Sequence, residues 1–171
     1  MDTVKDKIVQ WLLDEGLEVK SEIVPREAPV EWVLRVVARI PPTIAHILIQ
    51  QPAAKKDQLV FTLGILISPD HKAKYDALEG EDKIRVITEV LKTAYGICPE
   101  CIIVIQPDLV NAKNILITKI AYHEKLDRAL VADTIRKLSN ILALISAVLN
   151  AELKVLPKPR KDESGYPTSF M

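Results

Sequence analysis

Apolar residues near the start of the chain recur at three- and four-residue steps, which is the pattern of an amphipathic helix. The pattern predicts a helix over residues 2–15, whose first turn carries Thr3 and Asp6 at the spacing of a capping box. Gly16 follows, and glycine suits the left-handed turn that ends a helix. We therefore expect the domain to begin with one helix.

Beyond Gly16 the apolar period changes to two, which is the period of a strand with one exposed face. Four strands are predicted, over residues 17–23, 30–40, 44–51 and 59–68. Pro41 and Pro42 cannot lie within a central strand, so they separate the second strand from the third. The fourth strand is almost wholly apolar, which predicts that both of its faces are covered. The short connections favour an antiparallel meander.

A broken helix, a strand pair and a long helix are predicted for the remaining chain. Ser68 followed by Pro69 is typical of a helix start, and Gly80 interrupts this helix. A second helix is expected over residues 81–95, ended by Gly96. Its inward stripe is expected at Ile84, Ile87, Leu91 and Ala94. Strands are predicted over residues 102–106 and 115–122, and the last helix over residues 125–153.

These elements predict a single α+β domain with an antiparallel sheet, over residues 1–156. Residues 157–171 are charged and rich in proline, which is the composition of a mobile tail. The helix over residues 125–153 is as long as a domain of this size is wide, so part of its apolar stripe needs a second cover. That cover is either the sheet or a second copy of the chain. The side chains assigned to partner binding are Leu138, Ile141, Leu142, Ile145, Val148 and Leu149.

Composition excludes several classes of partner. Lysine and arginine number 23, and so do aspartate and glutamate, so net charge gives nucleic acid no reason to bind. No charge-free stretch reaches the roughly 18–20 apolar residues that a bilayer crossing needs, so we expect no membrane partner. The first residues do not have the pattern of a secretory signal, which favours a cytoplasmic location.

The pair Cys98 and Cys101 is the only specific short motif. Two cysteines at this spacing can ligate one zinc ion, but a closed zinc site takes four ligands and His46, His71 and His123 lie on other segments. The pair follows a predicted helix and precedes a strand, the reverse of the order in thioredoxin-like redox motifs. Four alternatives stay open: free thiols, which are the plainest, a structural disulfide, a shared metal site, and a redox pair.

Motifs of catalysis are missing from the sequence. The five glycines build no nucleotide-binding loop, and neither G-x-S-x-G nor H-E-x-x-H occurs. His71 is a candidate acid or base, at the rim of a cleft between the sheet and the helices of residues 69–95. A polar residue near a helix start is the plainer interpretation. We therefore expect no catalytic site and no cofactor apart from zinc at the cysteines, and we keep an enzyme of unmarked type as an alternative.

The order helix, four-stranded meander, broken helix, strand pair and long helix resembles the type III secretion chaperones and their uncharacterised bacterial and archaeal relatives. The likeness covers residues 2–153, although secretion chaperones typically have three strands before the middle helix rather than four. Residues 67–71, leading into a helix, are similar to archaeal members of unknown function. The resemblance implies a homodimeric, chaperone- or adaptor-like domain that binds a segment of another protein without chemistry.

Overall fold

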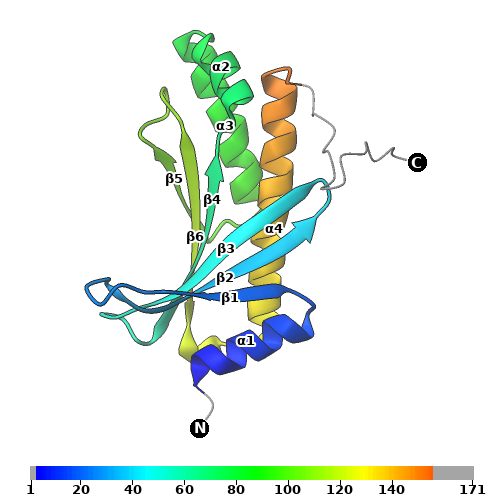
Figure 1. Cartoon of the computed structure of the whole chain (residues 1–171). Helices are drawn as coiled ribbons and strands as arrows, with labels where there is room; N and C mark the ends of the chain where they lie inside the picture. Colours follow the sequence, from blue (N-terminus) through cyan, green and yellow to red (C-terminus); the bar gives the residue numbers. More distant parts are fainter. Residues whose placement is uncertain (1–2, 156–171) are drawn as a thin grey trace.

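The computed structural model describes residues 3–155, and its elements follow the order expected from the sequence (Figure 1). The helices are α1 (Val4–Asp14), α2 (Pro69–Asp76), α3 (Gly80–Ile97) and α4 (Arg128–Glu152), with a short 3₁₀ helix η1 (His123–Lys125) before α4. The strands are β1 (Glu18–Glu22), β2 (Val30–Ile40), β3 (Thr43–Pro52), β4 (Gln58–Leu66), β5 (Ile102–Gln106) and β6 (Asn114–Tyr122). The expected α+β class is confirmed, and the expected tail over residues 157–171 lies outside the described residues.

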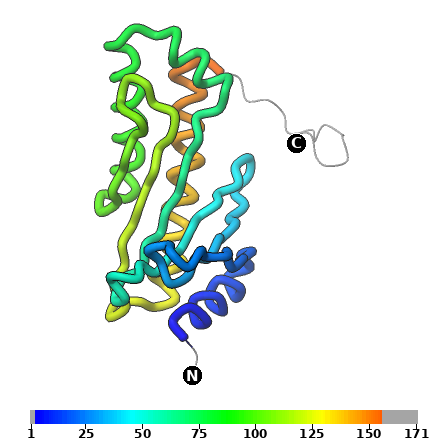
Figure 2. The backbone as a smooth tube through the Cα atoms, turned by 60° about the vertical axis from the view of Figure 1, so that its left-hand side comes forward, coloured from blue at the N-terminus to red at the C-terminus, as the bar shows by residue number. Residues whose placement is uncertain are grey.

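The six strands form one sheet in the order β1-β2-β3-β4-β6-β5, and every neighbouring pair is antiparallel. The β5–β6 hairpin joins the sheet through β6, which pairs with β4 along nine residues, so β5 lies at the margin. Strands β3 and β4 pair only where Ile47–Gln50 meets Val60–Leu63. Beyond that stretch the β2–β3 hairpin diverges from β4, as Figures 1 and 2 show.

The helices cover one face of this sheet. In Figure 1, α4 runs behind β2 and β3, and α3 lies alongside α4. The strand residues that point toward the helices form the core, which includes Leu34, Val36, Ile47, Ile49, Phe61, Leu63, Ile115 and Ile117. Because successive side chains of a strand point to opposite faces, the alternate residues of the same strands form a second face. No helix of the described chain covers that second face, which we call the open face.

Helix α1 confirms its sequence signals. The Thr3 hydroxyl accepts a hydrogen bond from the Asp6 amide, and the Asp6 carboxylate accepts one from the Thr3 amide. Gly16 has a φ of 73°, the left-handed region that favours glycine. The capping box and the glycine therefore fix both ends of the helix as expected.

Three expectations about individual elements are wrong. Strand β4 is not covered on both faces, because Leu59, Phe61 and Leu63 are buried whereas Leu66 is 76% exposed on the open face. On α3, the expected stripe is correct at Ile87 and Ala94, which are buried, and Leu91 is half-buried, but Ile84 is 49% exposed and the inner face is completed by Val86 and Val90. Helix α3 also continues through Gly96 to Ile97 and ends at Cys98, whose amide donates to the Ala94 carbonyl and whose side chain is fully buried. Ala94 and Cys98 are buried on the inner side of that last turn, and the helix extends past Gly96 to reach Cys98.

Candidate functional site: the open face of the sheet

The two cysteines are joined in a disulfide at the point where α3 ends and β5 begins. Their Cα atoms are 5.3 Å apart, and both side chains are buried. A sulfur bonded to its neighbour is not a thiolate, so in this form neither cysteine can ligate the zinc ion considered from the sequence. Among residues 3–155 there is also no group of three or more His, Cys, Asp or Glu side chains arranged to hold a metal ion. The structure therefore corresponds to the structural-disulfide alternative.

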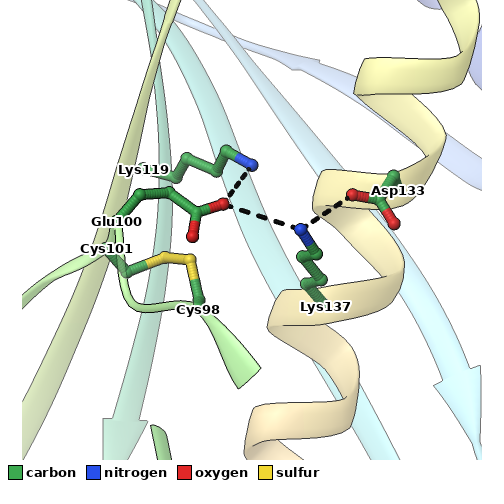
Figure 3. The surroundings of a disulfide bond; sticks show 6 residues. All are labelled: Cys98, Glu100, Cys101, Lys119, Asp133 and Lys137. Atoms are coloured by element: carbon green, nitrogen blue, oxygen red, sulfur yellow. Dashed lines mark hydrogen bonds and ion pairs between the residues drawn. A yellow bond between two sulfur atoms is a disulfide. The ribbon is translucent and has the colours of Figure 1, made fainter. Parts of the chain in front are cut away.

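Glu100, inside the disulfide loop, links this corner to the sheet and to α4 (Figure 3). Its carboxylate accepts a hydrogen bond from Lys119 of β6 at 2.9 Å and lies 3.6 Å from Lys137 of α4, which also pairs with Asp133. The hydrogen bond from Lys119 is the main cause that lowers the pKa of Glu100 to about 2, and a backbone hydrogen bond and Lys137 add to it. Because Lys119 is only 12% exposed and faces the helices, this carboxylate neutralises a cation at the edge of the core.

His71 takes part in a polar chain that joins α2 to α4. Its Nδ1 lies 2.6 Å from the Ser68 hydroxyl, and its Nε2 lies 2.9 Å from the Asn150 side-chain oxygen. Since that oxygen can only accept, Nε2 carries the proton, and Nδ1 accepts the hydrogen bond that the Ser68 hydroxyl donates. Both ring nitrogens are thus engaged in holding the first turn of α2 to the end of α4. The geometry matches the structural interpretation of His71 better than a role as acid or base.

A cavity of about 230 Å³ adjoins this chain, where β3 and β4 diverge. It is walled by the start of β3, the end of β4, Ser68, His71 and three residues of α4. His71 therefore borders a hollow, as expected, but its helical wall comes from α4 and not from α3. His46, on β3, is exposed beside it.

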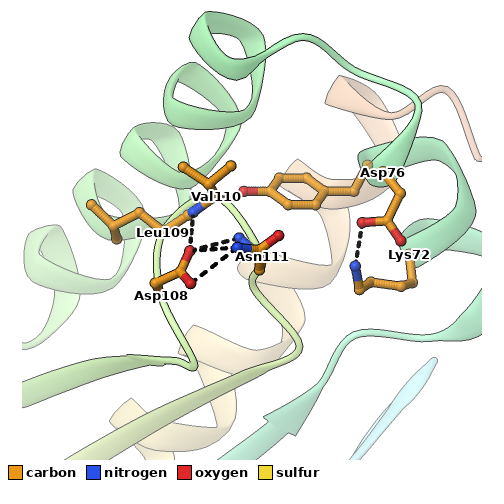
Figure 4. A network of polar contacts seen from close by, with 7 residues as sticks. Lys72, Asp76, Asp108, Leu109, Val110 and Asn111 are labelled. Atoms are coloured by element: carbon orange, nitrogen blue, oxygen red, sulfur yellow. Dashed lines mark hydrogen bonds and ion pairs between the residues drawn. The ribbon is translucent and has the colours of Figure 1, made fainter.

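A second polar cluster fixes the loop between β5 and β6 (Figure 4). The Asp108 carboxylate accepts hydrogen bonds from the Asn111 side chain and from the amides of Asn111 and Val110, both at 2.8 Å. The Asn111 side chain, followed by these amides, lowers the pKa of Asp108. The buried Tyr75 hydroxyl of α2 donates to the Leu109 carbonyl, and burial, followed by Asp108 and Asp76, raises the pKa of Tyr75 to about 12. The tip of the β5–β6 hairpin is thereby attached to α2.

The open face divides into a charged half and an apolar half. On β1 and β2, Arg35 pairs with Glu22 at 2.8 Å, and Glu18 pairs with both Lys20 and Arg39. On β4, β6 and β5 the open-face positions carry no charged residue at all. We call six side chains of this second region the apolar half-face: Val60, Ile102, Val104, Leu116, Ile120 and Tyr122.

The side chains of the apolar half-face are exposed or half-exposed and are grouped around the uncharged Thr62–Thr118 pair. Val60 lies directly opposite Ile120, and Val104 lies opposite Leu116, so side chains on neighbouring strands are adjacent. Ile102 is 52% exposed, Tyr122 46%, Val104 45% and Ile120 38%. A contiguous apolar patch with polar surroundings marks an interaction surface on a water-soluble domain. This patch is the candidate functional site.

The side chains that the sequence assigned to partner binding do not lie on the apolar half-face. Leu138, Ile141, Ile145 and Leu149 of α4 are buried in the core of the chain itself, and Leu142 and Val148 are half-buried against it. The sheet therefore covers this stripe, which was the first of the two alternatives. Sequence reasoning missed the apolar half-face, although the unbroken aliphatic run of Ile102–Ile105 was a signal of it.

Comparison with known proteins places the chain among uncharacterised relatives. A family model described as "Uncharacterized conserved protein (DUF2299)" matches residues 4–149. The crystal structure of an uncharacterised protein from Methanothermobacter thermautotrophicus superposes with a TM-score of 0.72 at 21% identity, over 87% of this chain and 98% of that one. YbjN from E. coli gives a TM-score of 0.45 at 12% identity, over 92% and 98%. A search of curated proteins finds no match. The expected resemblance to uncharacterised archaeal proteins is confirmed.

Proposed function

The chain belongs to the DUF2299 family, and from that premise we propose that it is a non-enzymatic binding protein that holds an amphipathic segment of another protein on the apolar half-face. The observation that supports the proposal is the absence of charge on the open-face positions of β4, β6 and β5, next to a face of β1 and β2 that is densely charged.

The chemistry of the patch defines the segment that would fit. The opposite face of the same strands is covered by α3 and α4 through aliphatic side chains. The apolar half-face offers aliphatic side chains on the same twisted surface, so an amphipathic helix can pack on it in the same way. A segment with charges on its contact side would lose hydration without gaining a partner. The proposed ligand therefore has one apolar, uncharged side.

A helix-forming peptide library, selected against the full chain, tests this proposal. We expect selected peptides to carry apolar residues three and four positions apart, and to lose at least tenfold in affinity for Ile120→Lys, which places a cation in the patch directly opposite Val60. Leu13→Lys is the matched control, because Leu13 is 51% exposed on α1, far from the sheet's open face. Peptides that bind Ile120→Lys as tightly as the unmodified chain, or a selection that enriches none, would contradict the proposal.

We also propose, as the resemblance to dimeric chaperones suggests, that the binding protein is a homodimer. The side chains of α4 are buried and do not supply its interface. A different surface has to do so, and the margin of the sheet offers one.

A further inference from the structure

We infer that two copies of the chain pair antiparallel along β5, around a twofold axis at Val104, so that two six-stranded sheets become one. This inference rests on the homodimeric part of the proposed function and names the surface involved. Within residues 3–155, strand β5 has a strand neighbour on one side only, β6, and it lies at the margin of the sheet in Figure 1. The outward backbone groups of such a strand can pair with a strand from another chain.

The composition of β5 distinguishes it from a protected edge. Edge strands ordinarily carry charges, proline or bulges that prevent pairing with other chains. Strand β5 reads Ile-Ile-Val-Ile-Gln, with neither charge nor proline, and its ladder with β6 has no break from Ile102 to Gln106. The loop that follows β5 is held by Asp108 and Tyr75, which attach the tip of the hairpin to α2.

The other margin of the sheet, β1, shows the contrast. It reads Glu-Val-Lys-Ser-Glu. Twofold pairing around Lys20 would place Lys20 against its own copy and Glu18 against Glu22 of the second copy. Like charges directly opposite on neighbouring strands destabilise the pair. Self-pairing is therefore disfavoured at β1, whereas β5 can align with its own copy without opposing any like charges, and we assign the second copy of this chain to the β5 edge.

The strand also determines the register of the pairing. An axis at the central residue, Val104, aligns all five residues, so that Ile102 faces Gln106 and Ile103 faces Ile105 of the second copy. Any other axis leaves fewer residues paired. Residues directly opposite in an antiparallel pair share a face, so the half-buried Ile103 and Ile105 meet their counterparts on the helix side. On the open side, the two apolar half-faces become one continuous surface.

Single cysteines test both the edge and the register in the full chain. Cα atoms directly opposite in an antiparallel pair are about 4.5–5.5 Å apart, within the roughly 4.4–6.8 Å that a disulfide spans. Under a mild oxidant we expect Val104→Cys to give a covalent dimer. Ile102→Cys is the matched control, because its two copies would be about four residues, or about 14 Å, apart and cannot be linked. The buried Cys98–Cys101 disulfide stays closed under these conditions.

Measurement of the molecular mass in solution distinguishes a wrong β5 interface from the absence of any homodimer. We expect a dimer at tens of micromolar, a dimer dissociation constant raised at least tenfold by Val104→Lys, and one changed less than about twofold by Ile120→Lys, which lies one strand further in. A monomeric chain would overturn both the homodimer and the β5 pairing. A dimer that Ile102→Cys links as well as Val104→Cys, or that Val104→Lys leaves intact, would overturn the β5 pairing alone. Peptide binding by a monomer would leave the proposed partner binding in place.

Discussion

Glu100→Gln offers the sharpest test of how the disulfide corner is held to the sheet. The substitution keeps the shape of the side chain but removes the charge that neutralises Lys119, whose side chain is only 12% exposed. A pKa lowered from 4.5 to about 2 corresponds, at about 1.4 kcal/mol per unit, to an upper limit of about 3.4 kcal/mol. Glu100 itself is 45% exposed, so solvent screening reduces the expected loss to about 1 kcal/mol at pH 7.

The pH dependence of this effect has a definite sign. Because the pKa of Glu100 is lower in the folded chain, its stabilisation is complete above pH 4.5 and is lost as the pH falls through about 2. Urea unfolding at pH 7, 4, 3 and 2 should therefore show the unmodified chain converging on Glu100→Gln as the pH falls.

A matched control makes the comparison specific. Glu89→Gln is the same change at a carboxylate that pairs with Lys92 on the exposed side of α3, where both partners are in solvent. We expect it to change the free energy of unfolding by less than about 0.5 kcal/mol at every pH. A difference between Glu100→Gln and the unmodified chain that stays constant from pH 7 to pH 2, or equal stabilities at pH 7, would refute the argument.

Two further outcomes follow from burial and covalent structure. Reduction of the Cys98–Cys101 disulfide should lower the free energy of unfolding by about 2 kcal/mol, which is the loop-entropy value for so short a ring. Denaturation with and without reductant measures this loss, and unchanged stability would contradict it. Phe61→Ala should lower it by about 3–5 kcal/mol because Phe61 is fully buried under the helices, whereas Leu66→Ala should cost less than about 0.5 kcal/mol because Leu66 is 76% exposed. Similar losses for both would show that β4 is covered on its second face after all.

Local signals in the sequence predicted much of the architecture. The capping box at Thr3, the glycine at position 16 and the Ser68-Pro69 pair each act within a few residues, so their meaning does not depend on the rest of the fold. Period-two alternation correctly predicted a strand over residues 30–40, which is β2.

Properties that depend on distant residues could not be predicted in this way. The apolar residues of β4 led to the prediction of two covered faces. That prediction failed because the sequence pattern shows which residues are apolar but not whether another part of the chain covers them. The partner of His71 is Asn150, 79 residues away, and no local pattern connects them. The stripe on α4 was recognised as apolar, but only the topology of the sheet shows that it lies inside the core while the exposed apolar surface lies on the other side.

In the proposed dimer, the unequal margins of the sheet would limit further association. Each chain has one uncharged margin, β5, and one charged margin, β1. Pairing at β5 would therefore leave Glu18, Lys20 and Glu22 at both outer edges of the joined sheet. A higher protein concentration would then populate the dimer without extending it into filaments, because the twofold contact uses the β5 edge of both copies. The proposed twofold pairing would thus cover an aliphatic edge strand that could otherwise promote aggregation.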